Sequence, residues 1–322
     1  MSSIAAVAIG RNEGERLRRC LTSLVEQAER VVYVDSGSTD DSVQMARGMG
    51  VQVVELDTSV PFTAARARNA GFEALKPDLP DYVQFVDGDC GVQAGWLAIA
   101  AAELDARPEL GIVTGWRREI HPERSVYNAI ADFEWHRPAG EIAACGGDMM
   151  VRAAEFDALG GFNPVVIAAE DDEFCARMRK SGKTLWRLPQ QMTMHDANMT
   201  RFSEWWRRAV RSGHGFAQVG ALHPEHFVAE RKRVWVFGAI LPAITLAGLA
   251  AGFWPVLLIA AAAYGLSYFR TVSGLQREGL TRAEAKRLSV LLSLSKIPNF
   301  WGMLTYYKRR MTGAEMRLIE YK

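Results

Sequence analysis

Asp87 and Asp89, two aspartates separated by one glycine, are the residues of this chain best suited to carry out chemistry. They directly follow a largely apolar run at 82–86, which predicts a short buried strand that ends at the two acids. Carboxylates this close repel each other unless a cation lies between them. Since Mg²⁺ commonly shares its coordination between one or two carboxylates and substrate phosphates, the pair predicts a metal site that holds a nucleotide diphosphate. The alternative is an ordinary β-turn, because Asp-Gly is a frequent turn dipeptide.

Acidic residues also follow other predicted strands. Glu13 comes soon after the apolar run at 4–9, and Asp35 comes directly after the run at 31–34. Strands and helical patterns alternate up to about residue 115, which predicts an α/β fold with a doubly wound, mostly parallel sheet. Because the strand ends of such a sheet meet at one edge, three acidic sites there favour a ligand-binding site over three unrelated caps or turns.

The chain lacks the glycine-rich loops that usually bind phosphates. There is no GxxxxGK[ST] motif, and no GxGxxG motif follows the first predicted strand. A sheet that binds a nucleotide without such a loop needs another way to neutralise the diphosphate, and a metal on the Asp87 and Asp89 pair would provide one. Asp35 could accept hydrogen bonds from a base or a ribose.

The totals exclude several classes of protein. A net charge of +1 gives no case for nucleic-acid binding. The four cysteines are far apart and form no CxxC pair, so reduced thiols of a cytosolic compartment fit better than a disulfide scaffold or a zinc ribbon. The N-terminus has neither a basic region nor a long apolar region, and no signal peptide is predicted.

A series of short motifs, in order and at characteristic spacing, resembles the family 2 glycosyltransferases of the GT-A fold over roughly residues 4–215. The motifs are AIGRNE at 8–13, VDSGSTD at 34–40, ARNAG at 67–71, VDGD at 86–89, GGD at 146–148, GGF at 160–162, Glu170-Asp171 and His195.

The resemblance implies roles on the donor side of a site. Asp35 would contact the nucleobase, with Glu13 near it. Asp87 and Asp89 would form the DxD motif of the family, with Asp89 the preferred direct ligand of Mn²⁺ or Mg²⁺ and Asp87 nearer the ribose. Arg68 would help to position the donor.

The resemblance also implies a base and a further metal ligand. Asp171 matches the catalytic base of the family, with Glu170 and Asp172 as rivals, and His195 matches a histidine that often completes the metal site. On the residues alone, four consecutive acids at 170–173 also suit the first turn of a helix. A lone histidine such as His195 is more often structural.

The acceptor side is less well defined. By the same resemblance, Gly146, Gly147 and Asp148 would line the donor sugar and the acceptor. Trp135 is a candidate acceptor-side residue, although an aromatic side chain in a loop is as often there for packing.

The second half of the chain suggests a membrane. Residues 234–269 are almost free of charge, yet one helix of that length would span about 54 Å, too long for a hydrocarbon core of ~30 Å. A helical hairpin that turns near 252–255 fits better, and basic residues at both ends predict that both face the cytoplasm. The alternative is a buried hairpin of a soluble protein.

The expected organisation has three parts, and its C-terminal part loosely resembles the C-terminal segments of bacterial exopolysaccharide glycosyltransferases. These parts are a GT-A catalytic domain at 1–215, with a nucleotide-sugar half at about 1–115 and an acceptor half at about 116–215; an interfacial linker at 216–233; and a membrane region at 234–322, with the hairpin 234–269 and an interfacial or re-entrant segment at 288–307.

The expected function is an inverting, metal-dependent hexosyltransferase. It would move a sugar from a nucleotide diphosphate donor, a UDP-sugar by expectation, to a lipid-linked or polysaccharide acceptor at the cytoplasmic face of the cell inner membrane, as in exopolysaccharide biosynthesis. Such transfer needs a base for the acceptor hydroxyl and charge compensation for the leaving diphosphate.

Three rival functions remain open. A polyprenyl-phosphate sugar synthase would share the fold and the donor, but its acceptor would be a lipid phosphate. A scaffold would bind nucleotide sugars without turnover, and a nucleotidyltransferase would release pyrophosphate. A processive synthase is disfavoured because the chain has no QxxRW motif.

Overall fold

The computed structural model describes residues 2–320, which form two compact units. Unit 1 comprises Met1–Pro122 and Ala131–Asn198, and unit 2 comprises Glu123–Ile130 and Met199–Lys322. One of the points at which the chain passes between the units, from Ile130 to Ala131, lies within the helix α5 (Val126–Trp135).

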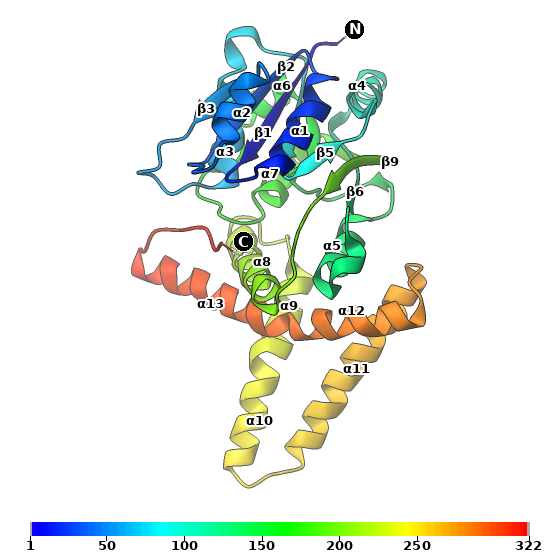
Figure 1. Cartoon of the computed structure of the whole chain (residues 1–322). Helices are drawn as coiled ribbons and strands as arrows, with labels where there is room; N and C mark the ends of the chain where they lie inside the picture. The colour runs from blue at the N-terminus through cyan, green and yellow to red at the C-terminus, as the bar shows by residue number, and fades with distance from the viewer. Residues whose placement is uncertain (1, 321–322) are drawn as a thin grey trace. The chain divides into compact units, whose positions relative to one another are not determined.

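Unit 1 is built on a single sheet of the described residues, with the strand order β3-β2-β1-β4-β8-β6-β9-β5 and with β7 paired to β9 (Figure 1). The strands are β1 (Ile4–Gly10), β2 (Arg30–Asp35), β3 (Gln52–Glu55), β4 (Tyr82–Asp87), β5 (Cys90–Val92), β6 (Leu110–Glu119), β7 (Gly140–Glu141), β8 (Met149–Arg152) and β9 (Thr184–His195).

The first four strands are parallel, and β6 is parallel to β9. The exceptions are β5, β7 and β8, which pair antiparallel with their neighbours. The predicted α/β fold with a mostly parallel sheet is therefore confirmed.

The strand register brings the predicted acids to one edge of the sheet. On the two sides of β1, Gly10 pairs with Asp35 of β2 and Ile9 pairs with Asp87 of β4. Both acids thus end their strands at the same level, as parallel strands require.

Helices cover both faces of the sheet because side chains alternate along each buried strand. Ala6 and Ala8 of β1 face one apolar cluster, whereas Ala5 and Val7 face the other. The first cluster contains residues of α1 (Glu15–Val25), α2 (Ser42–Gly48) and α4 (Trp96–Ala106). The second contains residues of α3 (Ala64–Glu73), α6 (Ala153–Ala158) and α7 (Glu170–Lys180).

Unit 2 is helical. Its helices after α5 are α8 (Phe202–Leu222), α9 (Val228–Trp235), α10 (Leu241–Ala250), α11 (Val256–Arg277), α12 (Arg282–Leu294) and α13 (Lys296–Thr312). Helices α8 and α13 pack very closely, because glycines lie where they cross: a Cβ on Gly213 would overlap the backbone of Asn299, and one on Gly302 would overlap that of Val210.

Two helical stretches of unit 2 are long and apolar enough to cross a membrane, Val228–Ala250 and Val256–Arg277. The first contains a π-helical turn, Val236–Ile240, just before Pro242, whose ring cannot continue the regular hydrogen-bond ladder. Helices α10 and α11 form a hairpin, and α12 and α13 run crosswise at its open end (Figure 1). The second stretch continues to Arg277, beyond the expected end of the hairpin at 269.

Candidate functional site

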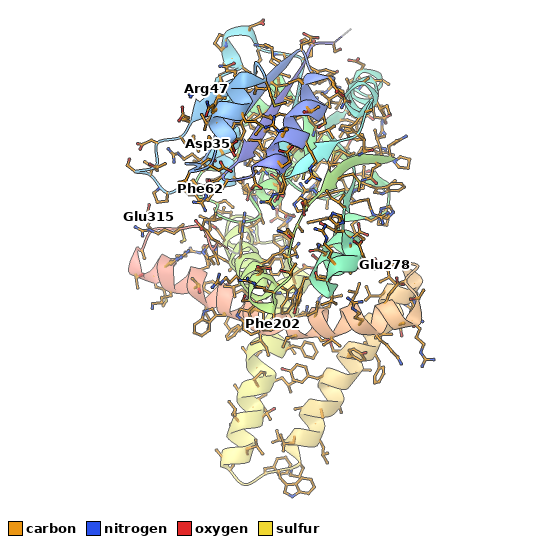
Figure 2. The ribbon with its side chains drawn as sticks, in the orientation of Figure 1. Asp35, Arg47, Phe62, Phe202, Glu278 and Glu315 are labelled. Carbon is orange, nitrogen blue, oxygen red and sulfur yellow. The ribbon has the colours of Figure 1, made fainter. Side chains whose placement is uncertain are left out.

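Asp35 ends β2 at the carboxyl edge and organises the loop that follows. Its carboxylate accepts hydrogen bonds from the Tyr33 hydroxyl at 2.8 Å and from the backbone amides of Gly37 and Ser38 at 2.9 and 2.7 Å. Burial and the neighbouring Asp35 raise the pKa of the Tyr33 hydroxyl, so it stays a donor. Asp35 lies at the same end of the sheet as Phe62 in the loop before α3 (Figure 2).

The loop after β1 is tied to the loop after β2 by Asn12, which sequence reasoning did not single out. Its amide oxygen accepts from the Thr39 backbone at 2.7 Å, and its own backbone N–H donates to Ser38 Oγ at 2.9 Å. Asn12 has a positive φ of 56°, which asparagine tolerates better than most residues. Glu13, next along this loop, pairs with Arg16 at 2.9 Å.

Asp87 lies between two arginines. Arg68 from α3 contacts its Oδ1 at 2.7 Å, and Arg117 from β6 contacts its Oδ2 at 3.1 Å. Burial would raise the pKa of Asp87, but these two guanidinium groups outweigh it and lower that pKa. The repulsion between Asp87 and Asp89 is thus relieved in part by the arginines of the chain itself.

Arg68 is itself buried and links three segments. Its Nη1 contacts Glu170, the first residue of α7, at 2.7 Å, while its Nη2 contacts Asp87 at the end of β4. Gly147 leaves room for this side chain, since a Cβ there would overlap the Arg68 guanidinium. The predicted residues Arg68, Asp87, Gly147 and Glu170 therefore meet in one place.

Asp148 is buried beneath this network rather than facing solvent. Its carboxylate pairs with Arg117 at 2.6 Å, accepts from the Thr193 hydroxyl at 2.9 Å and accepts from the backbone N–H of Asp87 at 3.1 Å. Asp148 thus fixes the ends of β4, β6 and β9 relative to one another.

The first turn of α7 separates its two leading acids. Glu170 is buried against Arg68, whereas Asp171 is partly exposed and lies beside Gly146, whose added Cβ would be 3.9 Å from Asp171 Oδ2. Burial, and then repulsion from Glu170 and Asp172, raises the pKa of Asp171 well above its usual range. A carboxylate with a raised pKa is a better proton acceptor near neutral pH.

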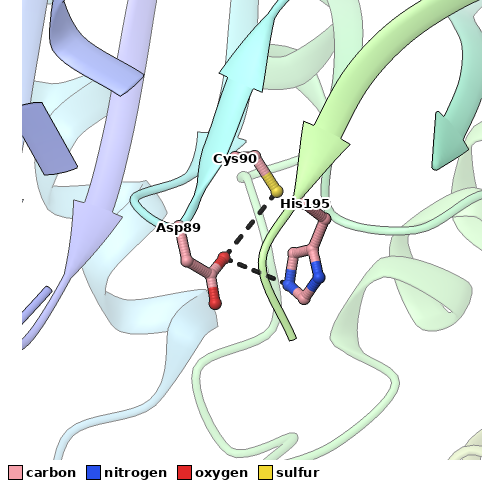
Figure 3. A group of neighbouring side chains, drawn as sticks. All are labelled: Asp89, Cys90 and His195. Carbon is pink, nitrogen blue, oxygen red and sulfur yellow. Dashed lines mark hydrogen bonds and ion pairs between the residues drawn. The ribbon is translucent and has the colours of Figure 1, made fainter. Parts of the chain in front are cut away.

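Asp89 and His195 form a second group, at the adjoining strands β5 and β9 (Figure 3). The Asp89 Oδ1 atom is 3.2 Å from Nε2 of His195. Burial alone would lower the pKa of His195, but the carboxylates of Asp89 and Glu119 outweigh it and raise that pKa. Within the described residues, the ligand atoms of Asp89, Cys90 and His195 lie within 4.8 Å of one another.

The donor set of this group suits a divalent cation. Asp89 supplies a buried carboxylate oxygen and His195 an imidazole nitrogen, and both are ligand types that divalent cations take. Burial raises the pKa of Cys90, which keeps its sulfur protonated and makes it a poor ligand for a hard cation. The pair Asp89 and His195 therefore fits a cation better than all three residues together.

Trp135, predicted on the acceptor side, lies at the end of α5 against the basic residues of the site. Its ring meets the His195 ring edge-on at 4.4 Å between centroids, and the Arg117 guanidinium is 5.3 Å from its ring. The partly buried Arg117 and the buried Glu119 are residues of the site that sequence reasoning missed. Both lie on the far half of β6, past the apolar run at 111–115 that marked the strand, and no motif points to them.

Comparison with known proteins shows which family models and which fold the chain matches. Residues 7–147 match the model of glycosyl transferase family 2, and residues 124–202 match the model described as the N-terminal domain of galactosyltransferase. The following two are among the solved structures that share the fold. The mannosyltransferase of Pyrobaculum calidifontis, in complex with GDP-mannose and Mn²⁺, has a TM-score of 0.62 at 20% identity, over 93% of this chain and 87% of that chain. Residues 1–349 of S. aureus TarS, in complex with UDP-GlcNAc, have a TM-score of 0.54 at 17% identity, over 98% of this chain and 93% of that chain.

Curated relatives match shorter parts of the chain. A TPR repeat-containing protein of Synechococcus elongatus is 27% identical over 139 residues, which are 43% of this chain and 33% of that protein. An uncharacterized glycosyltransferase of Rickettsia felis is 39% identical over 54 residues, which are 17% of this chain and 19% of that protein. The chain thus spans a third or less of the length of these relatives. The fold is that of the GT-A glycosyltransferases, and the resemblance to glycosyl transferase family 2 is confirmed over residues 7–147.

The space that Gly147 leaves for Arg68 can be tested with two neighbouring glycines. We expect Gly147→Ala to destabilise the protein by about 1–3 kcal/mol, because its Cβ displaces a buried, doubly paired guanidinium. Gly146→Ala is the matched control and should stay within about 0.5 kcal/mol, since its Cβ makes only ordinary contacts. Thermal unfolding of both variants measures the difference, and equal stability would contradict the packing described here.

Proposed function

We propose that the protein is an inverting glycosyltransferase that uses a nucleotide diphosphate sugar as its donor. The observation that carries the proposal is the meeting of three groups on the edge of a GT-A sheet: Asp35 with its loop, the Arg68 network, and the Asp89 and His195 pair. The neighbours bound to GDP-mannose and UDP-GlcNAc support a nucleotide-sugar donor.

On the donor side, the end of β2 would receive the nucleobase beside Asp35 and Glu13. Asp87, held between Arg68 and Arg117, would face the ribose. A divalent ion, Mn²⁺ or Mg²⁺, held by Asp89 and His195, would supply Lewis-acid stabilisation of the diphosphate charge. A UDP-sugar is the donor that we propose.

On the acceptor side, Asp171 would take the proton of the attacking hydroxyl. Its neighbour Glu170 is committed to Arg68, whereas Asp171 is partly exposed and has a raised pKa. Gly146 lies beside this acid and Gly147 lies against Arg68, and both glycines would line the sugar. The acceptor that we propose is a lipid-linked or polysaccharide chain.

The helical unit supports a membrane location. Leu246, Leu258 and Phe269 on the hairpin are 69%, 62% and 63% exposed, although large apolar side chains seldom lie exposed together on a soluble protein. Unit 2 has 19 Lys and Arg against 8 Asp and Glu, a formal charge of +11, whereas unit 1 has 19 against 29, a charge of −10. A basic unit that itself contains the apolar spans suits the anionic cytoplasmic leaflet of a bacterial inner membrane. Residues 234–322 would form this membrane region, with the segment 288–307 at the interface.

The main alternative is a polyprenyl-phosphate sugar synthase, which would attach the sugar to a lipid phosphate. A phosphate acceptor is already ionised and needs little help from a base. The variant Asp171→Asn therefore separates the two functions.

We expect Asp171→Asn to lower turnover about 10²-fold or more, because the attacking hydroxyl keeps its proton. The same variant should raise the melting temperature at pH 7. A carboxyl whose folded pKa is raised loses stability as the pH rises from its unfolded towards its folded pKa, and asparagine removes that loss. Asp41→Asn, at an exposed aspartate outside the site, is the matched control for turnover. Near-normal turnover in Asp171→Asn would favour a lipid-phosphate acceptor.

The donor and the cation are tested together in detergent-purified protein. We expect one or two nucleotide sugars of a panel to release nucleoside diphosphate with Mn²⁺ or Mg²⁺ and not with EDTA. Asp89→Ala should abolish this release, while Asp41→Ala, an exposed aspartate at the start of α2, should keep it. Unchanged turnover in Asp89→Ala would refute the cation assignment. UDP binding without any release or transfer, over many acceptors, would indicate a scaffold.

The hairpin topology is tested by cysteine labelling, since the native cysteines are all buried. Phe253 lies in the turn between α10 and α11. Glu278 follows α11 directly (Figure 2). The variants are Phe253→Cys and Glu278→Cys. In intact cells, a membrane-impermeant maleimide should label only the first, and the second should react after the inner membrane is opened. Labelling of both, or of neither, in intact cells would contradict the proposed topology.

A further inference from the structure

The buried carboxylate of Glu119 has so far been given no role in the proposed function. It ends β6, and the strand register sets it beside His195, which ends β9. On the other side of β9, His195 is the register partner of Cys90 in β5, the residue directly after Asp89. Three adjacent strands therefore place Asp89, His195 and Glu119 in a row across the sheet.

The row joins the two imidazole nitrogens to different carboxylates. Nε2 of His195 is 3.2 Å from Asp89 Oδ1, and Nδ1 is 3.6 Å from Glu119 Oε2. Nδ1 has no closer hydrogen-bond partner among the described residues. A different carboxylate therefore lies near each ring nitrogen.

Glu119 is held where it is by the backbone. It is 3% exposed, and it accepts hydrogen bonds from the backbone N–H groups of Ala197 at 2.9 Å and His121 at 3.2 Å. Trp135 packs edge-on against the His195 ring at 4.4 Å and hinders its rotation. The His195 imidazole is thus in contact with the Trp135 ring and has the fixed Glu119 carboxylate beside its Nδ1 atom.

In a neutral imidazole, the group beside each nitrogen decides which of the two nitrogens carries the proton. The ring carries one proton, and the nitrogen that binds a cation must offer its lone pair. If Nε2 faces the cation with Asp89, the proton must be on Nδ1, the nitrogen that points to Glu119. Metal-binding histidines generally donate their other N–H to such a partner, and its loss typically weakens metal binding 10–100-fold.

We propose that Glu119 is a positioning residue that selects the Nδ1–H tautomer of His195 and aims Nε2 at the cation beside Asp89. This inference rests on the cation site of the proposed function. A glutamine at 119 removes the negative charge that favours a proton on Nδ1, and with its NH₂ group towards Nδ1 it would favour the opposite tautomer, which blocks the lone pair on Nε2. Glu119 contributes in this way without touching the donor.

The test measures the affinity of the purified full-length protein for Mn²⁺ alone, from the free-ion signal in electron paramagnetic resonance. We expect Glu119→Gln to raise the Kd for Mn²⁺ about 10–100-fold. Glu141→Gln, an exposed glutamate on β7, which also pairs with β9, is the matched control and should leave the Kd unchanged. UDP binding without metal should stay the same in all variants, which separates positioning from unfolding.

A second variant covers the case in which Glu119→Gln does not fold. Glu119→Asp keeps the charge but withdraws it from Nδ1, and it should raise the Kd for Mn²⁺ several-fold. An unchanged Kd in whichever variant folds, or no binding of Mn²⁺ by the wild-type protein, overturns the proposal. If Glu119→Gln weakens Mn²⁺ binding but the wild-type protein transfers no sugar, the positioning role of Glu119 is supported and the proposed function is refuted. If the wild-type protein transfers sugar and Glu119→Gln binds Mn²⁺ normally, the proposed function is supported and the positioning role is refuted.

Discussion

The buried guanidinium of Arg68 is the interaction on which the candidate site depends. It joins α3, the end of β4 and the start of α7 through Asp87 and Glu170, each at 2.7 Å. Removing one partner of a buried ion pair costs about 3–5 kcal/mol, because the other charge is left without compensation. This network therefore holds three segments, far apart in the sequence, at one edge of the sheet.

Because of that network, the negative charges of Asp87 and Asp89 are balanced by different groups. Asp87 is paired with Arg68 and Arg117, whereas Asp89 is paired with His195. In the proposed function, the pair Asp89 and His195 is the part of the site that would bind the cation. The two aspartates of the Asp-Gly-Asp sequence thus face different partners, although they are only two residues apart. The direction of β4 and the turn that leads into β5 separate them.

The sequence by itself determined the fold class and the main places where chemistry could occur. Apolar runs at 4–9, 31–34 and 82–86 need burial on both faces, and parallel strands flanked by helices provide it. Once these strands are parallel, the acids that follow them must share an edge, so the meeting of Asp35 and Asp87 could be foreseen. The charge-free length of 234–269 likewise dictated two helices, because it is too long for a single span.

Only the tertiary structure decided which partner each acid takes. The pairing of Arg68 with Glu170 joins residues 102 positions apart, and no local periodicity encodes such a contact. The sequence did not point to Arg117 and Glu119, because their partners on β9 are set by the register between β6 and β9. Irregularities near Trp116 shift that register. Residue types and spacing thus determine which groups can react. Long-range pairing determines which of these groups meet, because the strands and helices that carry them are brought together by burial of apolar surface across the whole fold.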